Sequence, residues 1–125
     1  MDAATPVDLR AELDALTEHW SPRIVARVND QYVKVAKVLG EFVWHAHPDE
    51  DELFQIVYGT LVIQFEDRDD VVLEPGQVYV VPKGVRHNPV AREEVGLVLI
   101  ETVTTTHTGD TESDRAKSID DQLLG

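Results

Sequence analysis

The middle of the chain, from Tyr32 to Thr104, consists of short runs of β-branched and other apolar residues separated by turn residues. Runs of this length bounded by Gly, Pro and Asp are typical of strands. The pattern predicts strands at residues 32–39, 41–45, 52–58, 61–65, 71–73, 77–81, 87–90 and 95–103. No helical pattern interrupts them, so we expect the strands to pair with one another in a closed or sandwiched antiparallel architecture. The predicted fold class is all-β.

The pattern before this region is that of a helix. Apolar residues recur there at helical spacing on one face, at Leu9, Leu13, Leu16 and Trp20. Thr5 followed by Pro6 is typical of a helix start, and Ser21 followed by Pro22 ends the pattern. A short helix with a single apolar face is not stable alone in water, so we expect it to pack against the strands.

The chain becomes polar beyond Val103, and His107 in this stretch is expected to be solvated. A short helix is predicted from about Ser113 onward, with apolar residues at Ala116, Ile119 and Leu123. A chain of 125 residues has the size of one ordinary domain. We divide it into a helical arm at 1–28, a barrel at 29–104, and a C-terminal tail at 105–125 that either belongs to the same domain or is partly disordered.

The charge and the residue counts exclude several classes of function. The chain has 24 acidic and 11 basic residues and a formal net charge of -13. This charge repels nucleic acids and anionic membranes, so we expect neither as a partner. There is no cysteine, which excludes disulfides and thiolate metal sites, so any metal ion must be held by His, Asp or Glu. The chain has neither a signal-like N-terminus nor an apolar run of the ~20 residues that a spanning helix needs, and a cytoplasmic location is expected.

Three histidines and one glutamate form a candidate metal site. His45 and His47 are separated by one residue at the end of a predicted strand. Alternation places both side chains on the same face, able to converge on one ion. Glu52 starts the next predicted strand, and His87 follows the turn at 82–84. A lone His-x-His pair is weak evidence for a metal site, but the whole set is much stronger.

Two segments of the chain resemble the motifs of the cupin superfamily, small jelly-roll barrels that include germins, oxalate decarboxylases and many sugar isomerases. The first runs from Gly40 to Gly59 and reads GEFVWHAHPDEDELFQIVYG. The second runs from Gly76 to Ala91 and reads GQVYVVPKGVRHNPVA. The first spacer is four residues long where the family usually has five, and Ala91 stands where Asn is usual. The resemblance covers about residues 30–104 and implies a single double-stranded antiparallel jelly-roll barrel, with an N-terminal helix and a polar C-terminal tail added.

The resemblance implies that His45, His47, Glu52 and His87 hold one divalent transition metal per chain. Three imidazoles and one carboxylate suit Mn, Fe, Ni, Co, Cu or Zn better than Ca or Mg, which prefer oxygen ligands throughout. Four protein ligands on an octahedral ion leave two positions open for water, oxygen or substrate. The motifs do not indicate which of these metals is bound.

The resemblance also implies a small metalloenzyme that acts on a small polar metabolite. Isomerases, decarboxylases and dioxygenases all occur in the superfamily, and the fold alone does not choose among them. The alternative is a non-catalytic ligand-binding or regulatory cupin. In either case we expect the partner to be a small molecule.

Strand parity extends the candidate site beyond the metal ligands. Counting in twos from the ligands gives the expected pocket-lining residues Val43, Phe54, Ile56 and Tyr58. Glu41 has the same parity as His45 and is a candidate catalytic residue, because Glu52 as a metal ligand cannot also transfer protons. The alternative is a solvated carboxylate beside the bend at Gly40, since an unpaired buried carboxylate is costly.

The opposite parity of the same strand is also apolar, at Phe42 and Trp44. A strand that is apolar on both faces is covered on both faces. The resemblance implies pairing of small cupins through such a face. We therefore expect a homodimer that covers the outward face of Phe42 and Trp44.

Overall fold

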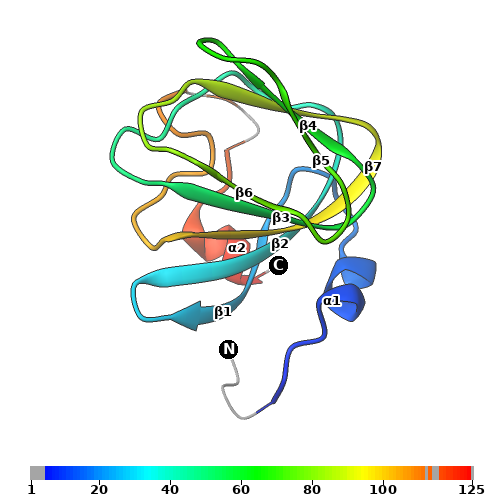
Figure 1. The fold of residues 1–125 in the computed structure, drawn as a ribbon. Helices are drawn as coiled ribbons and strands as arrows, with labels where there is room; N and C mark the ends of the chain where they lie inside the picture. Colours follow the sequence, from blue (N-terminus) through cyan, green and yellow to red (C-terminus); the bar gives the residue numbers. More distant parts are fainter. Residues whose placement is uncertain (1–4, 112, 114–115, 125) are drawn as a thin grey trace.

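Antiparallel strands wrap around one interior in the structure, a computed structural model that describes residues 5–111, 113 and 116–124 (Figure 1). The strands are β1 (Arg23–Val28), β2 (Gln31–Glu41), β3 (Glu52–Tyr58), β4 (Leu61–Phe65), β5 (Val71–Leu73), β6 (Val78–Val81) and β7 (His87–Thr102). The helices are α1 (Leu9–Ala15) and α2 (Ile119–Leu124). Residues 1–4, 112, 114, 115 and 125, which belong to the predicted arm and tail, lie outside the described residues.

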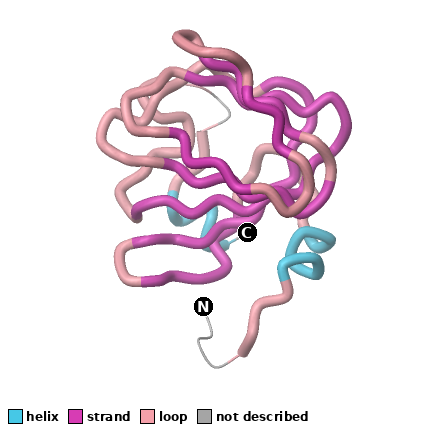
Figure 2. Tube along the Cα trace, in the orientation of Figure 1, coloured by secondary structure: helices cyan, strands magenta, loops and turns pink. Residues whose placement is uncertain are grey.

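Strand β7 connects the two parts of the barrel wall. The pairing order is β1-β2-β7-β3-β6, and β4 pairs with both β5 and β7. The start of β7, from His87 to Val90, pairs with β4, whereas its later residues from Gly96 to Glu101 lie between β2 and β3. Figure 2 shows the strands forming the wall, with loops extending from their ends. The fold is the predicted double-stranded antiparallel jelly-roll barrel, and the all-β class is confirmed.

Some predicted strand boundaries were wrong. The predicted strands 87–90 and 95–103 form one strand, because the exposed charged residues 92–94 continue the strand on its solvent side and do not form a turn. The predicted strand 41–45 does not form, because the register of β2 shifts next to Gly40 and the chain leaves the sheet after Glu41. The segment predicted as a helical arm also contains β1, which pairs with β2.

Helix α1 is shorter than the apolar pattern predicted. The helix begins after Asp8, whose side chain accepts a hydrogen bond from the Ala11 N–H at 3.0 Å. Asp8 is therefore the N-cap, since its carboxylate satisfies a backbone donor of the first turn. The helix starts later than the predicted start at Thr5 and Pro6. The helix ends at Ala15, and Trp20 adopts a left-handed backbone conformation with φ of 59°. Trp20 leaves the helical face and packs inside the barrel.

The outer face of the sheet is partly covered by α1, as Figure 1 shows. Leu13 and Leu16 of this segment pack with Val35 of β2 and Val98 of β7. Val35 and Val98 are paired across the two strands, so α1 lies over the β2–β7 ladder. The predicted packing of the helix on the strands is thus observed.

The inner faces of β2, β3 and β7 carry most of the core. Their apolar interior residues are Ala36, Val38, Phe54, Ile56, Val95, Leu97 and Leu99. Three charged residues have the same inward parity, one on each strand: Lys34, Glu52 and Glu101, all at most 5% exposed. Polar groups therefore gather inside the barrel at the ends of these strands where the candidate site lies.

A close approach between β3 and β7 requires Gly96. Tyr58 pairs with Gly96 after a register shift between Ile56 and Tyr58. The Tyr58 ring lies over Gly96 so closely that a Cβ atom there would overlap with the ring. The ring therefore packs on the outer face with α1, and its hydroxyl donates to Glu94 at 2.7 Å.

Replacing Gly96 by Ala is expected to lower the free energy of unfolding by about 1–3 kcal/mol, the usual cost of overpacking. The added methyl group must displace the Tyr58 ring or the strand backbone. Urea unfolding measures the effect. The same substitution in a Tyr58→Leu background should cost clearly less, and an equal cost in both backgrounds would contradict this explanation.

The segment after β7 folds back along the barrel. Helix α2 packs against β1 and begins at Ile119, later than the predicted start near Ser113. Within the described residues, no helix is long and apolar enough to cross a membrane.

Candidate metal centre

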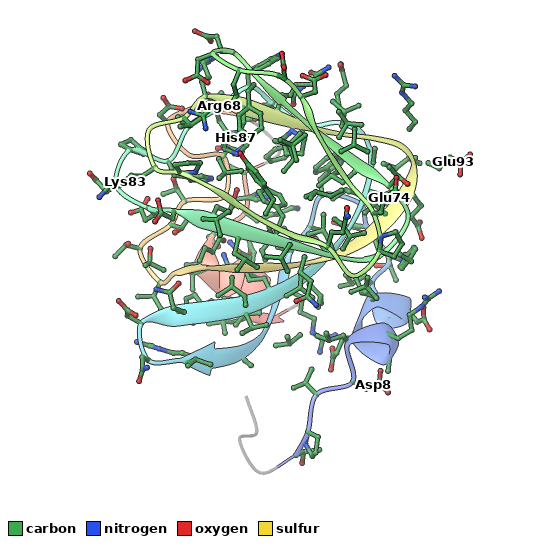
Figure 3. All side chains as sticks on the ribbon, in the orientation of Figure 1. Asp8, Arg68, Glu74, Lys83, His87 and Glu93 are labelled. Carbon is green, nitrogen blue, oxygen red and sulfur yellow. The ribbon has the colours of Figure 1, made fainter. Side chains whose placement is uncertain are left out.

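Four buried side chains converge inside the barrel. His45 and His47 lie between β2 and β3, Glu52 is the first residue of β3, and His87 is the first residue of β7. One ligand atom from each lies within 4.8 Å of the others. Figure 3 shows His87 within the barrel, whereas Glu93 extends outward. The structure thus brings together the four residues that the sequence predicted as metal ligands.

Backbone hydrogen bonds fix the positions of the three histidines. His45 and His87 form an isolated antiparallel bridge in which each N–H donates to the carbonyl of the other, at 3.0 and 2.8 Å. The carbonyl of His47 accepts a hydrogen bond from Gly84 N–H at 2.8 Å. The turn before His87 is therefore bonded directly to the segment that carries the other two histidines.

Backbone carbonyls also determine which nitrogen of two imidazoles is available. Nδ1 of His45 lies 2.8 Å from the Val43 carbonyl, and Nδ1 of His87 lies 2.9 Å from the Val85 carbonyl. A carbonyl can only accept, so each Nδ1 carries the proton and each Nε2 keeps a free lone pair. Among the described residues, Nε2 of His47 and of His87 has no hydrogen-bond partner although it is buried.

These groups fit one transition-metal ion. Two atoms that each lie about 2.1 Å from an ion are at most about 4.2 Å apart. The observed upper limit of 4.8 Å therefore requires only a small inward movement of the side chains. An ion would also satisfy the buried imidazole nitrogens that no protein group satisfies. The four side chains could hold a divalent ion, and their nitrogen-rich donor set favours a transition metal over Ca or Mg.

The electrostatics of the site favour a neutral imidazole at His45 and an ionised carboxylate at Glu52. Burial and the neighbouring His87 lower the pKa of His45 to about 4, so its Nε2 is unprotonated at neutral pH. Burial alone would raise the pKa of Glu52, but close polar contacts of its carboxyl group with Glu101, His47 and His87 hold this pKa well below the usual range. For His47, bonding to Glu52 outweighs burial and raises the pKa.

A cavity next to these ligands opens between the strands. His45, Glu52 and Glu101 supply its polar lining near the candidate metal centre. Its apolar lining includes Trp20, Ala36, Val38, Phe42, Phe54, Leu97 and Leu99. The rings of Trp20 and Phe42 are stacked with centroids 4.8 Å apart. This combination of apolar walls and a few convergent polar groups is typical of a small-molecule site.

Of the four predicted pocket residues, only Phe54 lines the cavity. Ile56 is buried in the core beyond it. Val43 contributes its carbonyl to His45 but does not line the cavity. Tyr58 does not lie inside the barrel, because the register shift after Ile56 turns its ring to the outer face.

Glu41 does not face the interior as strand parity predicted. Its side chain is exposed at the end of β2, beyond the register shift next to Gly40. The chain leaves the sheet after Glu41, so no strand alternation relates Glu41 to the face of His45. Glu41 is therefore a solvated carboxylate beside the bend at Gly40, which was the alternative interpretation.

The family assignment follows from a comparison with known domains. A model of the cupin domain matches residues 32–103, which is more than half of the chain. The chain belongs to the cupin family. The match spans the segment from the start of β2 to the end of β7 and contains all four candidate ligands.

Three relatives define the similarity of this cupin more closely. The uncharacterised protein YdbB of Bacillus subtilis is 43% identical over 63 residues, which cover 50% of this chain and 56% of YdbB. An acireductone dioxygenase of Bacillus licheniformis is 31% identical over 102 residues, which cover 77% of this chain and 57% of the enzyme. A cupin-2 domain containing protein from Shewanella frigidimarina, a solved structure, is 45% identical with a TM-score of 0.74, covering 77% of this chain and 93% of that chain. This cupin spans a little over half the length of the first two relatives.

Most of the residues that line the cavity of this cupin were not predicted from the sequence, and Trp20, His107 and Glu101 are the clearest cases. Trp20 was assigned to a helix and His107 to a solvated tail, yet both lie at the cavity, where His107 is 5.1 Å from Phe42 between ring centroids. Glu101 was not considered. One signal was available, since Glu101 has the same parity as the inward residues Leu97 and Leu99.

The segment after β7 fastens the backbone between the two neighbouring ligands. Asp110 accepts a hydrogen bond from Ala46 N–H through its side chain, at 2.8 Å, and donates its own N–H to the Ala46 carbonyl at 2.9 Å. The hydroxyl of Thr111 donates to the Trp44 carbonyl at 2.8 Å. Residues far beyond the barrel strands therefore hold the His45–His47 segment in place.

An Asp110→Ala variant is expected to bind Co²⁺ about 10-fold more weakly, because an outer partner that orients metal ligands typically contributes 10- to 100-fold in affinity. Isothermal titration of the metal-free protein measures the change. Asp69→Ala, which removes an exposed carboxylate elsewhere in the chain, is the matched control. Equal affinities for Asp110→Ala and the wild type would contradict the proposed contribution of Asp110.

Proposed function

We propose that this cupin is a metalloenzyme of the dioxygenase type that acts on a small molecule in the barrel cavity. One observation carries the proposal: four buried ligand groups converge, two of their imidazole nitrogens have no hydrogen-bond partner among the described residues, and two of the four, His45 and Glu52, line a cavity with apolar walls. The similarity to an acireductone dioxygenase over 77% of this chain supports the choice of reaction type over isomerisation or decarboxylation.

Each group has a definite task under this proposal. His45, His47, Glu52 and His87 would hold the ion, which supplies a Lewis acid and, if redox-active, electrons for reaction with O₂. The stacked rings of Trp20 and Phe42 would exclude water from the reacting groups.

Metal analysis followed by oxygen uptake tests the proposal. The protein is purified anaerobically without a His-tag, its metal content is measured, and O₂ consumption is recorded with a panel of small enediols and dihydroxybenzenes. We expect about one transition-metal ion per chain, and oxygen uptake that depends on both metal and substrate and is absent from His87→Ala. Metal binding with tight ligand binding but no turnover would favour a non-catalytic binding protein.

We also propose a homodimer, although not through Phe42, which turns inward onto Trp20. The Trp44 side chain is 37% exposed in the single subunit, as expected of a residue that a second subunit covers. Light scattering at micromolar concentration is expected to give the mass of a dimer. Trp44→Glu should shift it to the monomer, because burying an unpaired charge at an interface is unfavourable, and a wild-type monomer would contradict the proposal.

A further inference from the structure

A second carboxyl group lies beside the candidate metal centre. Glu101 of β7 is directly opposite Glu52 in the β3–β7 register. Its side chain is 3% exposed and lines the same cavity, and its carboxyl group interacts with that of Glu52. Glu101 is not one of the four candidate metal ligands. Metal binding by those four residues therefore does not explain why Glu101 is buried here.

One oxygen of this carboxyl group is held by a buried lysine. Nζ of Lys34 on β2 lies 2.6 Å from Oε1 of Glu101, and the Lys34 side chain is 1% exposed. Burying an ion pair is costly unless its remaining hydrogen-bonding capacity is also used. In the described part of the chain, Oε2 of Glu101 has no hydrogen-bond partner. Lys34 therefore fixes a carboxyl group whose second oxygen is unused by the protein.

The surroundings of that oxygen limit what can bind to it. The walls of the cavity are apolar, formed by residues such as Phe42, Phe54 and Leu99. A ligand must therefore place an apolar body against these walls and its polar atoms at the end where Glu52 and Glu101 lie. Lys34 is already paired with Glu101, so an anionic group placed directly at Oε2 would be repelled by the Glu101 carboxylate.

We propose that Glu101 is a ligand-binding residue, whose Oε2 forms a hydrogen bond with a hydroxyl group of a small uncharged molecule that also binds the metal ion through a neighbouring oxygen. The inference rests on the proposed function, because it requires an ion at the site. A hydroxyl fits because it can both donate and accept. Adjacent oxygens fit because the Glu52 and Glu101 carboxyl groups adjoin. The ligand class is therefore α-hydroxyketones, enediols and catechols.

The test compares two ligands that differ only at the proposed hydroxyl. Untagged protein loaded with Co²⁺ is titrated anaerobically with catechol and with 2-methylphenol, followed by the visible absorption of Co²⁺. Wild type is expected to bind catechol at least ~100-fold more tightly, because the methyl group leaves Oε2 unpaired. In Lys34→Met/Glu101→Leu, which removes the pair together, this ratio should fall at least ~10-fold with the Co²⁺ content unchanged.

Glu41→Gln, which changes an exposed carboxylate, is the control and should keep the wild-type ratio. A ratio near one in the wild type would overturn the inference without any variant. A wild-type ratio in the double variant would overturn it as well, and so would loss of Co²⁺ from that variant, because Glu101 would then serve the metal ligands. Failure of the wild type to bind Co²⁺ would contradict the proposed function itself, and the inference with it.

Discussion

Replacing His87 by Ala is expected to lower the affinity for Co²⁺ or Zn²⁺ by at least ~100-fold, beyond the usual effect of losing an outer partner. The substitution removes one of four ligand groups and leaves the remaining three buried around a gap. The barrel should stay folded, because the two hydrogen bonds between residues 45 and 87 involve only the backbone. Isothermal titration measures the affinity, and thermal unfolding of the metal-free protein measures the fold.

The matched control for this prediction is His19→Ala. His19 is an exposed histidine whose Nε2 lies 2.8 Å from Glu94 on the surface. Its loss should leave metal affinity and stoichiometry at wild-type values. Full metal occupancy in His87→Ala would contradict the assignment of the site, whatever metal is used.

The ligand set was predictable because it depends on short-range spacing. His45 and His47 are two residues apart, and Glu52 starts the strand that follows. The second motif then needs only the fold to bring His87 beside them. The barrel class was predictable for a similar reason, since short apolar runs without helices leave few ways to pair.

The lining of the cavity was less predictable, because parity counting assumes an uninterrupted strand. Register shifts occur in β2 next to Gly40 and in β3 after Ile56. The shift in β3 moves Tyr58 to the other face. Glu41 was counted back from His45, but no strand joins the two residues, because β2 ends at Glu41. A glycine accompanies both shifts: Gly40 stands at the first, and Gly96 is paired with Tyr58 at the second. A glycine alone does not identify a register shift in the sequence.

The Lys34–Glu101 pair could not be predicted, because it depends on the register between two strands far apart in the chain. Both residues have inward parity among apolar neighbours, which marks them as unusual. Only the β2–β7 register, which sets Lys34 opposite Leu99 and Tyr32 opposite Glu101, brings the two charges together. The contact of Asp110 with Ala46 is equally long-range and lies outside the motifs.

The buried pair leads to the second prediction with a large effect. Lys34→Met is expected to lower the free energy of unfolding by about 3–5 kcal/mol near pH 8, because it leaves the Glu101 carboxylate buried without a counter-charge. Urea unfolding in the presence of EDTA measures this without a contribution from bound metal. Lys37→Met, on the same strand but only partly buried, is the matched control and should change stability by less than about 0.5 kcal/mol.

The loss in Lys34→Met should depend on pH in a definite direction. Burial and the charge of Glu52 raise the pKa of Glu101 well above 4.5, and Lys34 opposes this rise. Without Lys34 the pKa of Glu101 in the folded protein rises further. The folded variant is therefore most stable at low pH, where Glu101 is neutral, and its free energy of unfolding falls as the pH rises through that raised pKa. The loss of unfolding free energy in Lys34→Met, relative to the wild type, should therefore be smaller at pH 5.5 than at pH 8.

Removing both charges in Lys34→Met/Glu101→Leu should restore stability to within about 1 kcal/mol of the wild type or above it. A double variant as unstable as Lys34→Met would show that the lysine stem packs the core and that its charge contributes little.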